Sequence, residues 1–343
     1  MGNLFSRNEF PIDGHTIVVT GGSRGMGFEV ARQLAERGAH VVIVARNAEK
    51  LQLGVDYMKD GAVKPQSQRF HMISADLSVP TESARVINEV VTWNRGIPPD
   101  TVWCCAGSSY PTLFVDTPVS QFQDQMNSNY FTSLYMAHAT LLCWLKGNKD
   151  TSASTELKHT TERGVSSPRQ SQRHIIFTAS FVSFYSFAGY SPYSPAKAAL
   201  RNLSDTLSQE MNLYATAHPG EPRVRFHTIF PGTILTESYD EENRIKTDLT
   251  KLLEGSDEGQ KPSVVAAKSI EGLERGQELI TTNLLTALVK RGVLGGSVRG
   301  GIVPALGDWI LAWVLGIVMV FVRHDMDQKT RSWGRNYGPS GMK

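Results

Sequence analysis

Short apolar runs rich in β-branched residues alternate with segments of helical periodicity through the first two thirds of this chain. The first run, TIVVT at residues 16–20, is typical of a buried strand, and the segment at 28–38 has apolar residues at helical spacing. Further strands are predicted at 40–46, 69–75, 101–107, 174–180 and 224–230, and further helices at 48–58, 83–93, 118–145 and 193–216. Because strands that alternate with helices at this spacing form βαβ units, the sequence predicts an α/β fold of Rossmann type. Its doubly wound parallel sheet would carry helices on both faces, and a hydrophobic helical tail would follow at the C-terminus.

The composition is that of a folded protein and excludes several classes of function. Hydrophobic residues make up 41% and charged residues 20% of the 343 positions, which is typical of a globular chain. The net charge of +2 is too small to indicate a nucleic-acid partner, and we expect none. Cys104, Cys105 and Cys143 are too few and wrongly spaced for a zinc site or a disulfide framework, so we expect no metal and a reducing compartment.

A glycine-rich loop, TGGSRGMG at residues 20–27, joins the first strand to the first helix. Gly21 permits a tight turn, Gly25 lets the backbone approach a pyrophosphate, and Gly27 allows the helix to pack closely. The N-terminus of the helix would offer N–H groups and the positive end of its dipole to the phosphates. In this strand–turn–helix setting the loop predicts a dinucleotide cofactor.

Two arginines near this loop bear on which cofactor it binds. The second strand ends in Ala45 and Arg46, where NAD-binding proteins usually carry an acidic residue for the ribose 2′-hydroxyl. Arg46 instead suits a 2′-phosphate, and Arg24 in the glycine-rich loop can reach the same place. Either arginine alone is equally compatible with a solvated surface charge. Together, with no acid at position 45 or 46, they favour NADPH.

The stretch GYSPYSPAKAAL at 189–200 holds two tyrosines that compete for one lysine. Tyr193 and Lys197 are four residues apart and face each other on a helix, whereas Tyr190 is seven residues away. Pro192 biases the residue before it toward an extended conformation, which places Tyr190 in a loop and Tyr193 in the first helical turn. A lone tyrosine–lysine pair at this spacing is more often a packing residue and a solvated charge, so its meaning depends on the rest of the chain.

Seven motifs in chain order make the sequence between residues 15 and 232 similar to the short-chain dehydrogenase/reductase family. They are the T-G-x-x-x-G-x-G loop from Thr20 to Gly27, Asp76-Leu77, Ala106-Gly107, Asn129, Ser180, Tyr193-x-x-x-Lys197 and Pro231-Gly232. The resemblance implies a catalytic tetrad formed by Asn129, Ser180, Tyr193 and Lys197. It also implies cofactor contacts at Thr20, Gly21, Ser23, Arg24, Gly25, Gly27, Arg46, Asp76, Leu77, Ala106, Gly107, Tyr193, Lys197, Pro231 and Gly232, with Asp76 against the adenine ring.

Each tetrad residue would then have a physical role in reducing a ketone. Tyr193 would donate a proton to the carbonyl oxygen as hydride arrives from NADPH, and Ser180 would hydrogen-bond the developing alkoxide. Lys197 would hold the nicotinamide ribose and, with the oxidised nicotinamide, lower the pKa of Tyr193 from about 10. Asn129 would steady Lys197 through a water molecule. No G-x-S-x-G surrounds Ser180, which argues against a hydrolase nucleophile.

One position departs from the family pattern. Members usually have Asn-Asn-Ala-Gly after the fourth strand, and this chain has Cys104-Cys105-Ala106-Gly107. A backbone turn can survive the change, but the side-chain bonds of the two asparagines cannot. We therefore expect Cys104 and Cys105 to pack as small hydrophobic residues.

Among these reductases the chain most resembles the fungal 3-ketodihydrosphingosine reductases, in TGGSRGMG, FAGYSPYSPAK, FPGTILTES and the hydrophobic tail. That resemblance implies NADPH-dependent reduction of a long-chain keto-lipid, the 3-keto group of 3-ketodihydrosphingosine becoming the hydroxyl of dihydrosphingosine in sphingolipid synthesis. It further implies the endoplasmic reticulum membrane, an active site facing the cytosol, and a homodimer or homotetramer. The alternative is another membrane-bound lipid or steroid ketoreductase, of the long-chain 3-ketoacyl or 17β-hydroxysteroid type. A third reading is a non-catalytic dinucleotide-binding scaffold, against which the intact tetrad argues.

The domain organisation follows from shifts in composition. We expect an N-terminal segment at 1–14, a Rossmann-type reductase domain at 15–282 and a membrane-associated tail at 283–343. Within the domain, the polar residues at 147–173 form a flexible insertion and residues 233–262 form the substrate lid.

The two ends of the chain carry possible membrane signals. In the tail, WILAWVLGIVMVFV at 309–322 is apolar all round a helix, with Trp309 and Trp313 near one end as at a bilayer interface. This pattern favours membrane association over burial in the domain or in a dimer interface, although the flanking charges do not decide an orientation. At the other end, Gly2 and Ser6 match a myristoylation pattern that is common by chance.

Overall fold

The computed structural model describes residues 8–147, 172–218, 220–255, 258–293 and 301–337. Gly2, Ser6 and nearly all of the insertion predicted at 147–173 lie outside the described residues.

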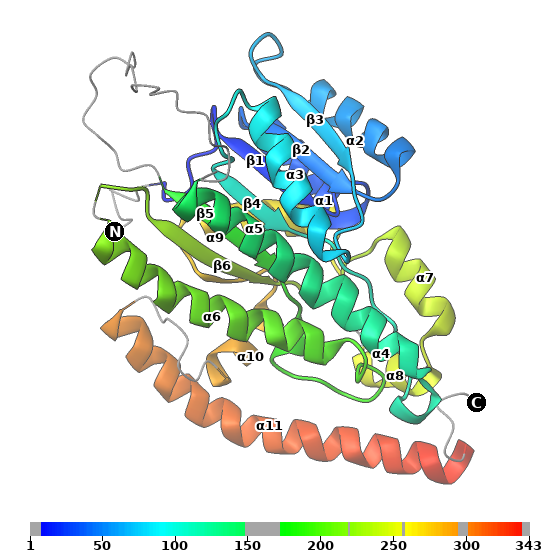
Figure 1. Cartoon of the computed structure of the whole chain (residues 1–343). Helices are drawn as coiled ribbons and strands as arrows, with labels where there is room; N and C mark the ends of the chain where they lie inside the picture. The colour runs from blue at the N-terminus through cyan, green and yellow to red at the C-terminus, as the bar shows by residue number, and fades with distance from the viewer. Residues whose placement is uncertain (1–7, 148–171, 219, 256–257, 294–300, 338–343) are drawn as a thin grey trace.

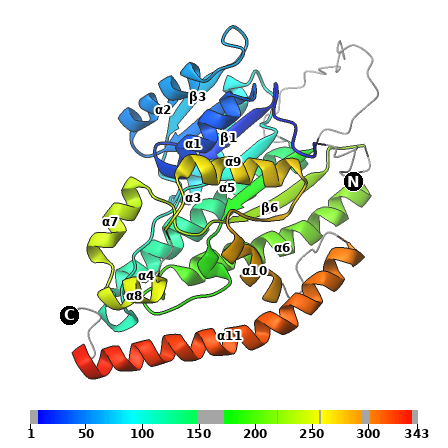
Figure 2. The same ribbon diagram turned by 180° about the vertical axis from the view of Figure 1, so that it is seen from behind.

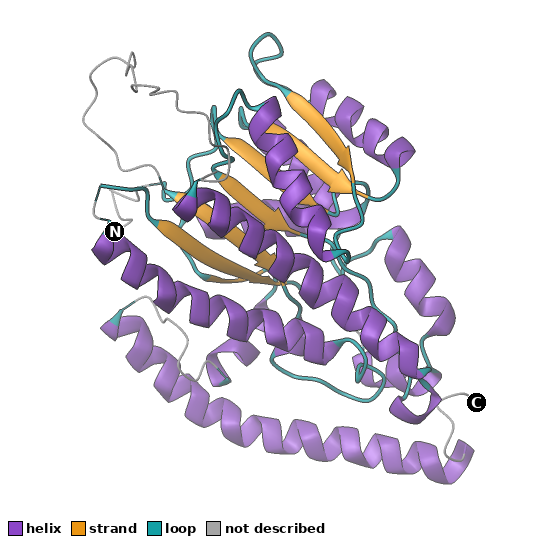
Figure 3. Cartoon of the chain, viewed as in Figure 1, coloured by secondary structure: helices purple, strands orange, loops and turns teal. Residues whose placement is uncertain are grey.

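Seven parallel strands form one sheet in the order β3-β2-β1-β4-β5-β6-β7, drawn in orange in Figure 3. They are β1 (Thr16–Thr20), β2 (His40–Ala45), β3 (Phe70–Ser74), β4 (Thr101–Cys104), β5 (Arg173–Thr178), β6 (Val224–Phe230) and β7 (Leu279–Thr281). The chain runs outward from β1 to β3 and then returns to place β4 on the other side of β1. In such sheets ligands bind at the carboxyl ends of the strands where the order reverses. The predicted doubly wound parallel sheet is confirmed.

Helices cover both faces of the sheet, as Figures 1 and 2 show from opposite sides. On one face lie α1 (Gly25–Ala35), α2 (Ala48–Asp60) and α9 (Pro262–Glu274), and on the other α3 (Pro80–Trp93), α5 (Thr132–Lys146) and α6 (Ser194–Ala217). Because both faces are covered, β1 is buried at all five positions, which explains its continuous apolar run. Phe10 and Ile12, which precede β1, belong to the core beneath α1 and α9.

The differences from the predicted elements have physical causes. The seventh strand, β7, was not predicted, because three residues are too few to give a periodic signal. The single helix predicted at 118–145 is divided into α4 (Val119–Met126) and α5 by a π-helical turn, η2 (Asn127–Phe131).

Three short helices and one long helix complete the described structure, and the long helix α11 runs along the outside of the molecule below α6 in Figure 1. The predicted lid region contains α7 (Glu237–Ile245) and α8 (Asp248–Glu254), and α10 (Leu284–Gly292) leads to α11 (Ile302–Tyr337). Short 3-10 turns lie at η1 (Phe114–Asp116) and η3 (Phe181–Ser183). Helix α11 packs on α10 near its start, where Asp308 pairs with Arg291 at 3.5 Å, and on α8 near its end, where Trp333 joins Leu249 and Leu253 in one buried cluster.

Candidate active site

The predicted site residues gather along one edge of the sheet. Thr20 ends β1, and Arg46, Asp76, Ala106, Ser180 and Pro231 follow the ends of β2, β3, β4, β5 and β6. Because the strands are parallel, these ends meet at a common edge, where Tyr193 and Lys197 at the start of α6 and Asn129 in η2 join them.

Asn129 is fully buried in the π-helical turn, and its side chain is fixed by the loop after β4. Its amide nitrogen donates to the carbonyl oxygens of Ser108 at 2.8 Å and Gln125 at 2.9 Å, while its Oδ1 accepts from the Ser108 N–H at 3.2 Å. Such single-turn π segments are frequent at functional sites. The sequence predicts Asn129 within a helix. In the structure, the π-helical turn η2 places its side chain at the carboxyl edge of the sheet.

Lys197 lies in the first turn of α6 with only 4% of its surface exposed. Its Nζ donates to the carbonyl oxygen of Thr178, the last residue of β5, at 2.9 Å. A Cβ added to Gly107 would lie 2.5 Å from Asn129 Oδ1 and 3.2 Å from Lys197 Nζ, so both side chains border the space beside Gly107. Burial lowers the pKa of Lys197 to about 8. This arrangement is compatible with the predicted link between Asn129 and Lys197 through water.

Tyr193 directly precedes α6, and the Lys197 Nζ is 5.6 Å from the centre of its ring. Burial raises the pKa of Tyr193 above its usual value and the nearby Glu242 raises it further, whereas the Ser180 hydroxyl acts in the opposite direction. Burial is therefore the dominant influence on the pKa of Tyr193 in this structure. A phenol with a raised pKa stays protonated near neutrality, which is the form that can donate a proton.

Ser180 follows β5 at the start of η3, where its Oγ accepts from the Val182 N–H at 3.4 Å. The Phe181 N–H donates to the Pro231 carbonyl oxygen at 2.8 Å and so ties the turn after β5 to the turn after β6. Pro231 is buried and Gly232 is half-buried beside it. The Ser180 hydroxyl, which faces Tyr193, therefore lies on a turn that hydrogen bonds hold in place.

Tyr190 has a different partner from Tyr193. Its hydroxyl donates to Glu254 Oε1 of α8, and its side chain is buried in the loop before α6. The Tyr190 and Tyr193 ring centres are 6.1 Å apart. Tyr190 thus joins α8 to this loop, and Tyr193 is the tyrosine beside Lys197 and Ser180.

The glycine-rich loop has the form that a dinucleotide phosphate requires. Gly21 has a φ of 67°, and a Cβ there would lie 2.8 Å from the Ala106 backbone nitrogen, so the turns after β1 and β4 touch. A Cβ at Gly27 would lie 2.4 Å from the Gly21 carbonyl oxygen. Helix α1 begins at Gly25, has no acidic residue in its first turn and has no side-chain cap on its N–H groups. These N–H groups remain for an anion, which fits the predicted cofactor.

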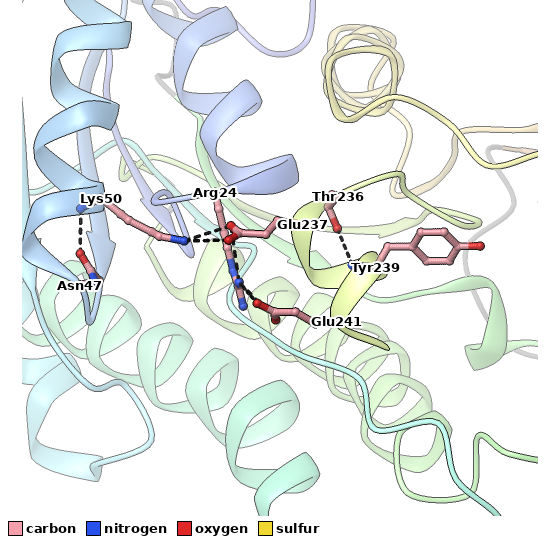
Figure 4. Close-up of polar contacts among 7 residues, drawn as sticks. All are labelled: Arg24, Asn47, Lys50, Thr236, Glu237, Tyr239 and Glu241. Carbon is pink, nitrogen blue, oxygen red and sulfur yellow. Dashed lines mark hydrogen bonds and ion pairs between the residues drawn. The ribbon is translucent and has the colours of Figure 1, made fainter. Parts of the chain in front are cut away.

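Arg24 and Lys50 are paired with acidic residues of α7, as Figure 4 shows. Arg24 Nη1 lies 3.1 Å from Glu241 Oε1 and 3.8 Å from Glu237 Oε2, and Lys50 Nζ lies 3.0 Å from Glu237 Oε2. These ion pairs join the glycine-rich loop and the start of α2 to α7. The sequence identified Arg24 as a candidate site residue but not Lys50. Lys50 belongs to no motif and lies in an ordinary helix, so nothing in the sequence marks it.

The remaining predicted cofactor residues lie around the same edge. Arg46 is exposed after β2. Asp76 accepts hydrogen bonds from the backbone and hydroxyl of Ser78, which lower its pKa, and the charge of Arg46 adds a smaller lowering. Leu77 is buried in the core beneath α3, and Ser23 is half-buried in the glycine-rich loop. The Thr20 hydroxyl accepts from the Ala106 N–H at 3.3 Å.

The two cysteines that replace the family's asparagines lie inside the protein. Cys104 is 1% exposed within the second core cluster, and Cys105 packs against the first. Burial raises the pKa of the Cys104 thiol and raises that of Cys105 to about 12. Thr178 donates to Cys105 Sγ at 3.5 Å. Both thiols stay protonated and pack as small apolar groups.

Helix α7 and Lys246, the residue that follows it, include side chains that the sequence did not identify as functional. Lys246 is buried, with its Nζ 2.8 Å from Glu254 Oε1 of α8 and 4.9 Å from the centre of the Tyr239 ring. Glu242, one turn earlier on the helix, lies close enough to Tyr193 and Lys197 that its charge raises the pKa of both. A lysine and two acids in a polar segment give no signal of burial, so only the fold reveals this cluster.

Helix α11 exposes a broad apolar surface. Residues 302–334 are long and apolar enough to cross a membrane by length and composition, with a mean hydropathy of 2.2 in an 18-residue window of which 6% is buried. Trp309, Trp313 and Phe321 are 65%, 73% and 70% exposed. An exposed apolar surface of this extent marks a binding or membrane surface.

The profile of the short chain dehydrogenase family matches residues 15–151 and 159–246. The chain belongs to the short-chain dehydrogenase family. Its members are oxidoreductases that use a nicotinamide dinucleotide, which agrees with the glycine-rich loop at the end of β1.

Named relatives and a solved structure extend the comparison. The chain is 46% identical to the 3-ketodihydrosphingosine reductase ksrA of Aspergillus fumigatus over 97% of this chain and 88% of that protein. It is 37% identical to the 3-ketodihydrosphingosine reductase gsl-3 of Neurospora crassa over 98% of this chain and 87% of that one. A short chain dehydrogenase of Salmonella enterica serovar Typhi superposes with a TM-score of 0.59 at 19% identity, over 81% of this chain and 98% of that one, which supports the fold.

Proposed function

We propose that this protein reduces the 3-keto group of 3-ketodihydrosphingosine to the hydroxyl of dihydrosphingosine, with NADPH as the reductant. The observation that carries the proposal is the assembly of Tyr193, Ser180 and Lys197 at the carboxyl edge of the sheet. The names of the relatives from Aspergillus fumigatus and Neurospora crassa support the choice of substrate.

The proposed chemistry uses groups whose positions suit each step. NADPH bound at the glycine-rich loop would supply the hydride. The protonated Tyr193 donates its proton to the ketone oxygen, and Ser180, braced by η3, hydrogen-bonds the same oxygen as charge develops. Lys197 is held by Thr178 and borders the space beside Asn129, so it can hold the nicotinamide ribose and return a proton toward Tyr193.

The remaining cofactor residues of the proposal are those at the strand ends. Thr20, Gly21, Ser23, Gly25 and Gly27 would hold the pyrophosphate, and Ala106, Gly107, Pro231 and Gly232 would line the nicotinamide end. Asp76 and Leu77 would contact the adenine. The exposed Arg46, with Arg24 nearby, supports a 2′-phosphate and thus NADPH over NADH, although Arg24 must exchange Glu241 for the phosphate.

We infer that the protein meets its lipid substrate at a membrane. The exposed apolar side of α11 supports this, and its packing on α8 brings it to the lid region. In this proposal, residues 15–282 form the reductase domain, 233–262 its lid and 283–343 the membrane-associated tail, at the cytosolic side of the endoplasmic reticulum. A homodimer or homotetramer is part of the same proposal by family resemblance.

An assay of the purified protein in phospholipid vesicles tests the proposal against its alternative. NADPH consumption is measured with 3-ketodihydrosphingosine, with a long-chain 3-ketoacyl substrate and with a 17-ketosteroid. We expect the highest kcat/KM on 3-ketodihydrosphingosine. A clear preference for either other ketone would replace the proposed substrate, and no reduction of any ketone would support a scaffold.

A further inference from the structure

Helix α7 has two faces with different surroundings. Glu237 and Glu241, four residues apart, point toward Arg24 and Lys50, and Figure 4 shows Tyr239 extending away from them. Tyr239, Glu242 and Lys246, at spacings of three and four, share the opposite face. Because Lys246 on that face is buried and paired with α8, the face that carries Glu242 is turned toward the protein.

Glu242 lies one helical turn before Lys246 on this inner face. The Lys246 Nζ is 5.9 Å from the centre of the Tyr190 ring, which is 6.1 Å from the centre of the Tyr193 ring. Its charge acts on Tyr193 and on Lys197, the two residues proposed to move the proton. The Ser109 hydroxyl, from the loop after β4, faces the carboxyl from another side. Glu242 is therefore an acidic group on the face of α7 that is turned toward the Tyr190–Tyr193 pair.

The neighbouring cation is already committed to another acid. Lys246 Nζ lies 2.8 Å and 3.0 Å from the two carboxylate oxygens of Glu254, and Tyr190 donates to the same carboxylate. Among the residues that the structure describes, no ion pair within 4.0 Å joins Glu242 to a lysine or arginine. Burial accordingly raises the pKa of Glu242 to about 7, against the smaller attraction of Lys246.

We propose that Glu242 is a specificity-determining residue, whose carboxylate binds a protonated amine on the carbon next to the ketone of the substrate. The inference rests on the proposed function, because 3-ketodihydrosphingosine carries an amine on C2 beside its C3 carbonyl. With the carbonyl oxygen at Tyr193 and Ser180, this amine supplies the cation that Glu242 lacks. A 3-ketoacyl chain or a steroid has no amine there and leaves the carboxylate unpaired, which a desolvated site strongly disfavours.

A pair of ketones that differ only in the amine tests this proposal. The kcat/KM is measured on 3-ketodihydrosphingosine and on 1-hydroxyoctadecan-3-one, which lacks the C2 amine. We expect Glu242→Gln to lower kcat/KM on the amino ketone by about 10- to 100-fold, the range for a lost hydrogen bond to a charged group. On the ketone without the amine, we expect a change of less than about threefold.

Matched variants separate recognition from structure. Asp240→Asn removes an exposed carboxylate from the same helix and should change neither value. Glu242→Asp keeps the charge and should retain more of the preference for the amine than Glu242→Gln. The dissociation constant for NADPH, measured by fluorescence, should be the same for wild type and Glu242→Gln, since the cofactor loop meets the other face of α7.

The pH profile provides a second readout. The groups that face Glu242 are Ser109, Tyr190, Tyr193, Lys197, Glu241, Lys246 and Glu254. With a pKa of about 7, Glu242 must ionise to bind the amine, so kcat/KM on the amino ketone should rise with pH through this region. Glu242→Gln should lose that rise, and the ketone without the amine should not show it.

The possible results are distinguishable. A selective loss on the amino ketone supports the proposal. Equal losses on both ketones would assign Glu242 to proton delivery or to the fold, and no loss on the amino ketone would overturn amine recognition while leaving the proposed reductase activity intact. If the wild type reduces only the ketone without the amine, both the substrate assignment and this inference fail.

Discussion

The carboxyl edge of the sheet and the α7–α8 segment both face Tyr193, but they are held in different ways. At the sheet edge, Lys197 and Asn129 bond to main-chain carbonyls of Thr178 and Ser108, and the strands behind them are buried. Helix α7 has no buried hydrophobic residue and is held largely by side-chain pairs such as Arg24 with Glu241 and Lys50 with Glu237.

This difference separates chemistry from access. Hydrogen bonds to the backbone of a packed sheet fix the proposed proton-transfer groups, whereas solvent-exposed ion pairs are each worth about 0 to 1 kcal/mol and can be exchanged. Segments with few buried contacts open at low free-energy cost. We therefore expect the sheet edge to determine the reaction and the α7–α8 segment to determine which substrate enters and when.

The largest predicted effect is at the sheet edge. Tyr193→Phe keeps the ring but removes the proton donor, so kcat should fall by about 10²- to 10⁴-fold, the range for a lost general acid. The dissociation constant for NADPH should stay nearly unchanged. A variant with near wild-type kcat would show that another group donates the proton. The sheet edge would then not determine the reaction.

A smaller effect is expected at Arg46, where we propose that the 2′-phosphate of the cofactor binds. Arg46→Asp places a carboxylate where a 2′-phosphate is proposed to bind, so the ratio of kcat/KM for NADPH over NADH should fall by about 10- to 100-fold. The neighbouring Asn47, which caps α2 through the Lys50 N–H, provides a structural control because Asn47→Ser keeps a cap. A wild type with equal kcat/KM for both cofactors would contradict the assignment of Arg46.

The tail should affect access and leave the reaction intact. Changing both Trp309 and Trp313 to Ser removes exposed apolar surface from α11. It leaves intact the contact between Trp333, near the end of α11, and helix α8. We expect weaker co-sedimentation with phospholipid vesicles and about a tenfold lower kcat/KM on the vesicle-borne substrate, with little change on a short water-soluble ketone. Deleting residues 303–343 should release the protein from membranes, but it also exposes Leu249 and Leu253. Equal losses on both ketones from the double substitution would place these tryptophans in a structural role.

Two buried histidines make the sheet itself sensitive to acid. His174 on β5 and His227 on β6 are in contact, with His174 Nδ1 lying 3.0 Å from His227 Nε2. Burial lowers the pKa of His227 to about 4 and lowers that of His174 well below its usual value. Because the unfolded chain binds protons near pH 6.5 and the folded chain does not, stability is complete above pH 6.5 and falls as the pH drops toward 4.

From pH 7.5 to pH 5, His227 alone should reduce the free energy of unfolding by about 2 kcal/mol. Urea titrations at the two pH values measure this loss. Changing the exposed His138 to Gln should leave the loss unaltered. Stability that is independent of pH over this interval would mean that the pair is protonated or hydrated in the folded protein.

The smallest effect is expected at Tyr190. Tyr190→Phe removes a hydrogen bond to Glu254, but Lys246 still pairs with that carboxylate, so kcat/KM should fall by no more than about fivefold. The same assay that measures Tyr193→Phe measures this variant. Equal losses for the two tyrosine variants would erase the distinction between the sheet edge and the α7–α8 segment.

The features that the sequence predicted are those fixed by local spacing. Tyr193 and Lys197 are one helical turn apart, and the glycine-rich loop directly follows a five-residue apolar strand, so both could be identified without the fold. Six of the strands were predicted for the same reason. The three residues of β7 are too few to show an alternating hydrophobic pattern. Its place in the sheet depends on packing beside β6.

The α7–α8 contacts could not be predicted, because they join residues far apart in the chain. Arg24 and Glu241 are 217 positions apart, and Tyr190 and Glu254 are 64 apart. The buried position of Lys246 and the half-buried position of Glu242 contradict what a polar segment suggests. Their roles depend on which face of α7 meets the sheet edge, and only the tertiary structure determines that.

One measurement tests the central claim most directly. The protein in vesicles is given a single turnover of 3-ketodihydrosphingosine with NADPH deuterated at C4 of the nicotinamide, once on each face, and the product is analysed by mass spectrometry. We predict that one of the two deuterated cofactors gives dihydrosphingosine with one deuterium on C3. We expect Tyr193→Phe to form this product far more slowly than the wild type. Product without deuterium from either cofactor, or undiminished product from Tyr193→Phe, would contradict hydride transfer to the ketone with Tyr193 as the proton donor.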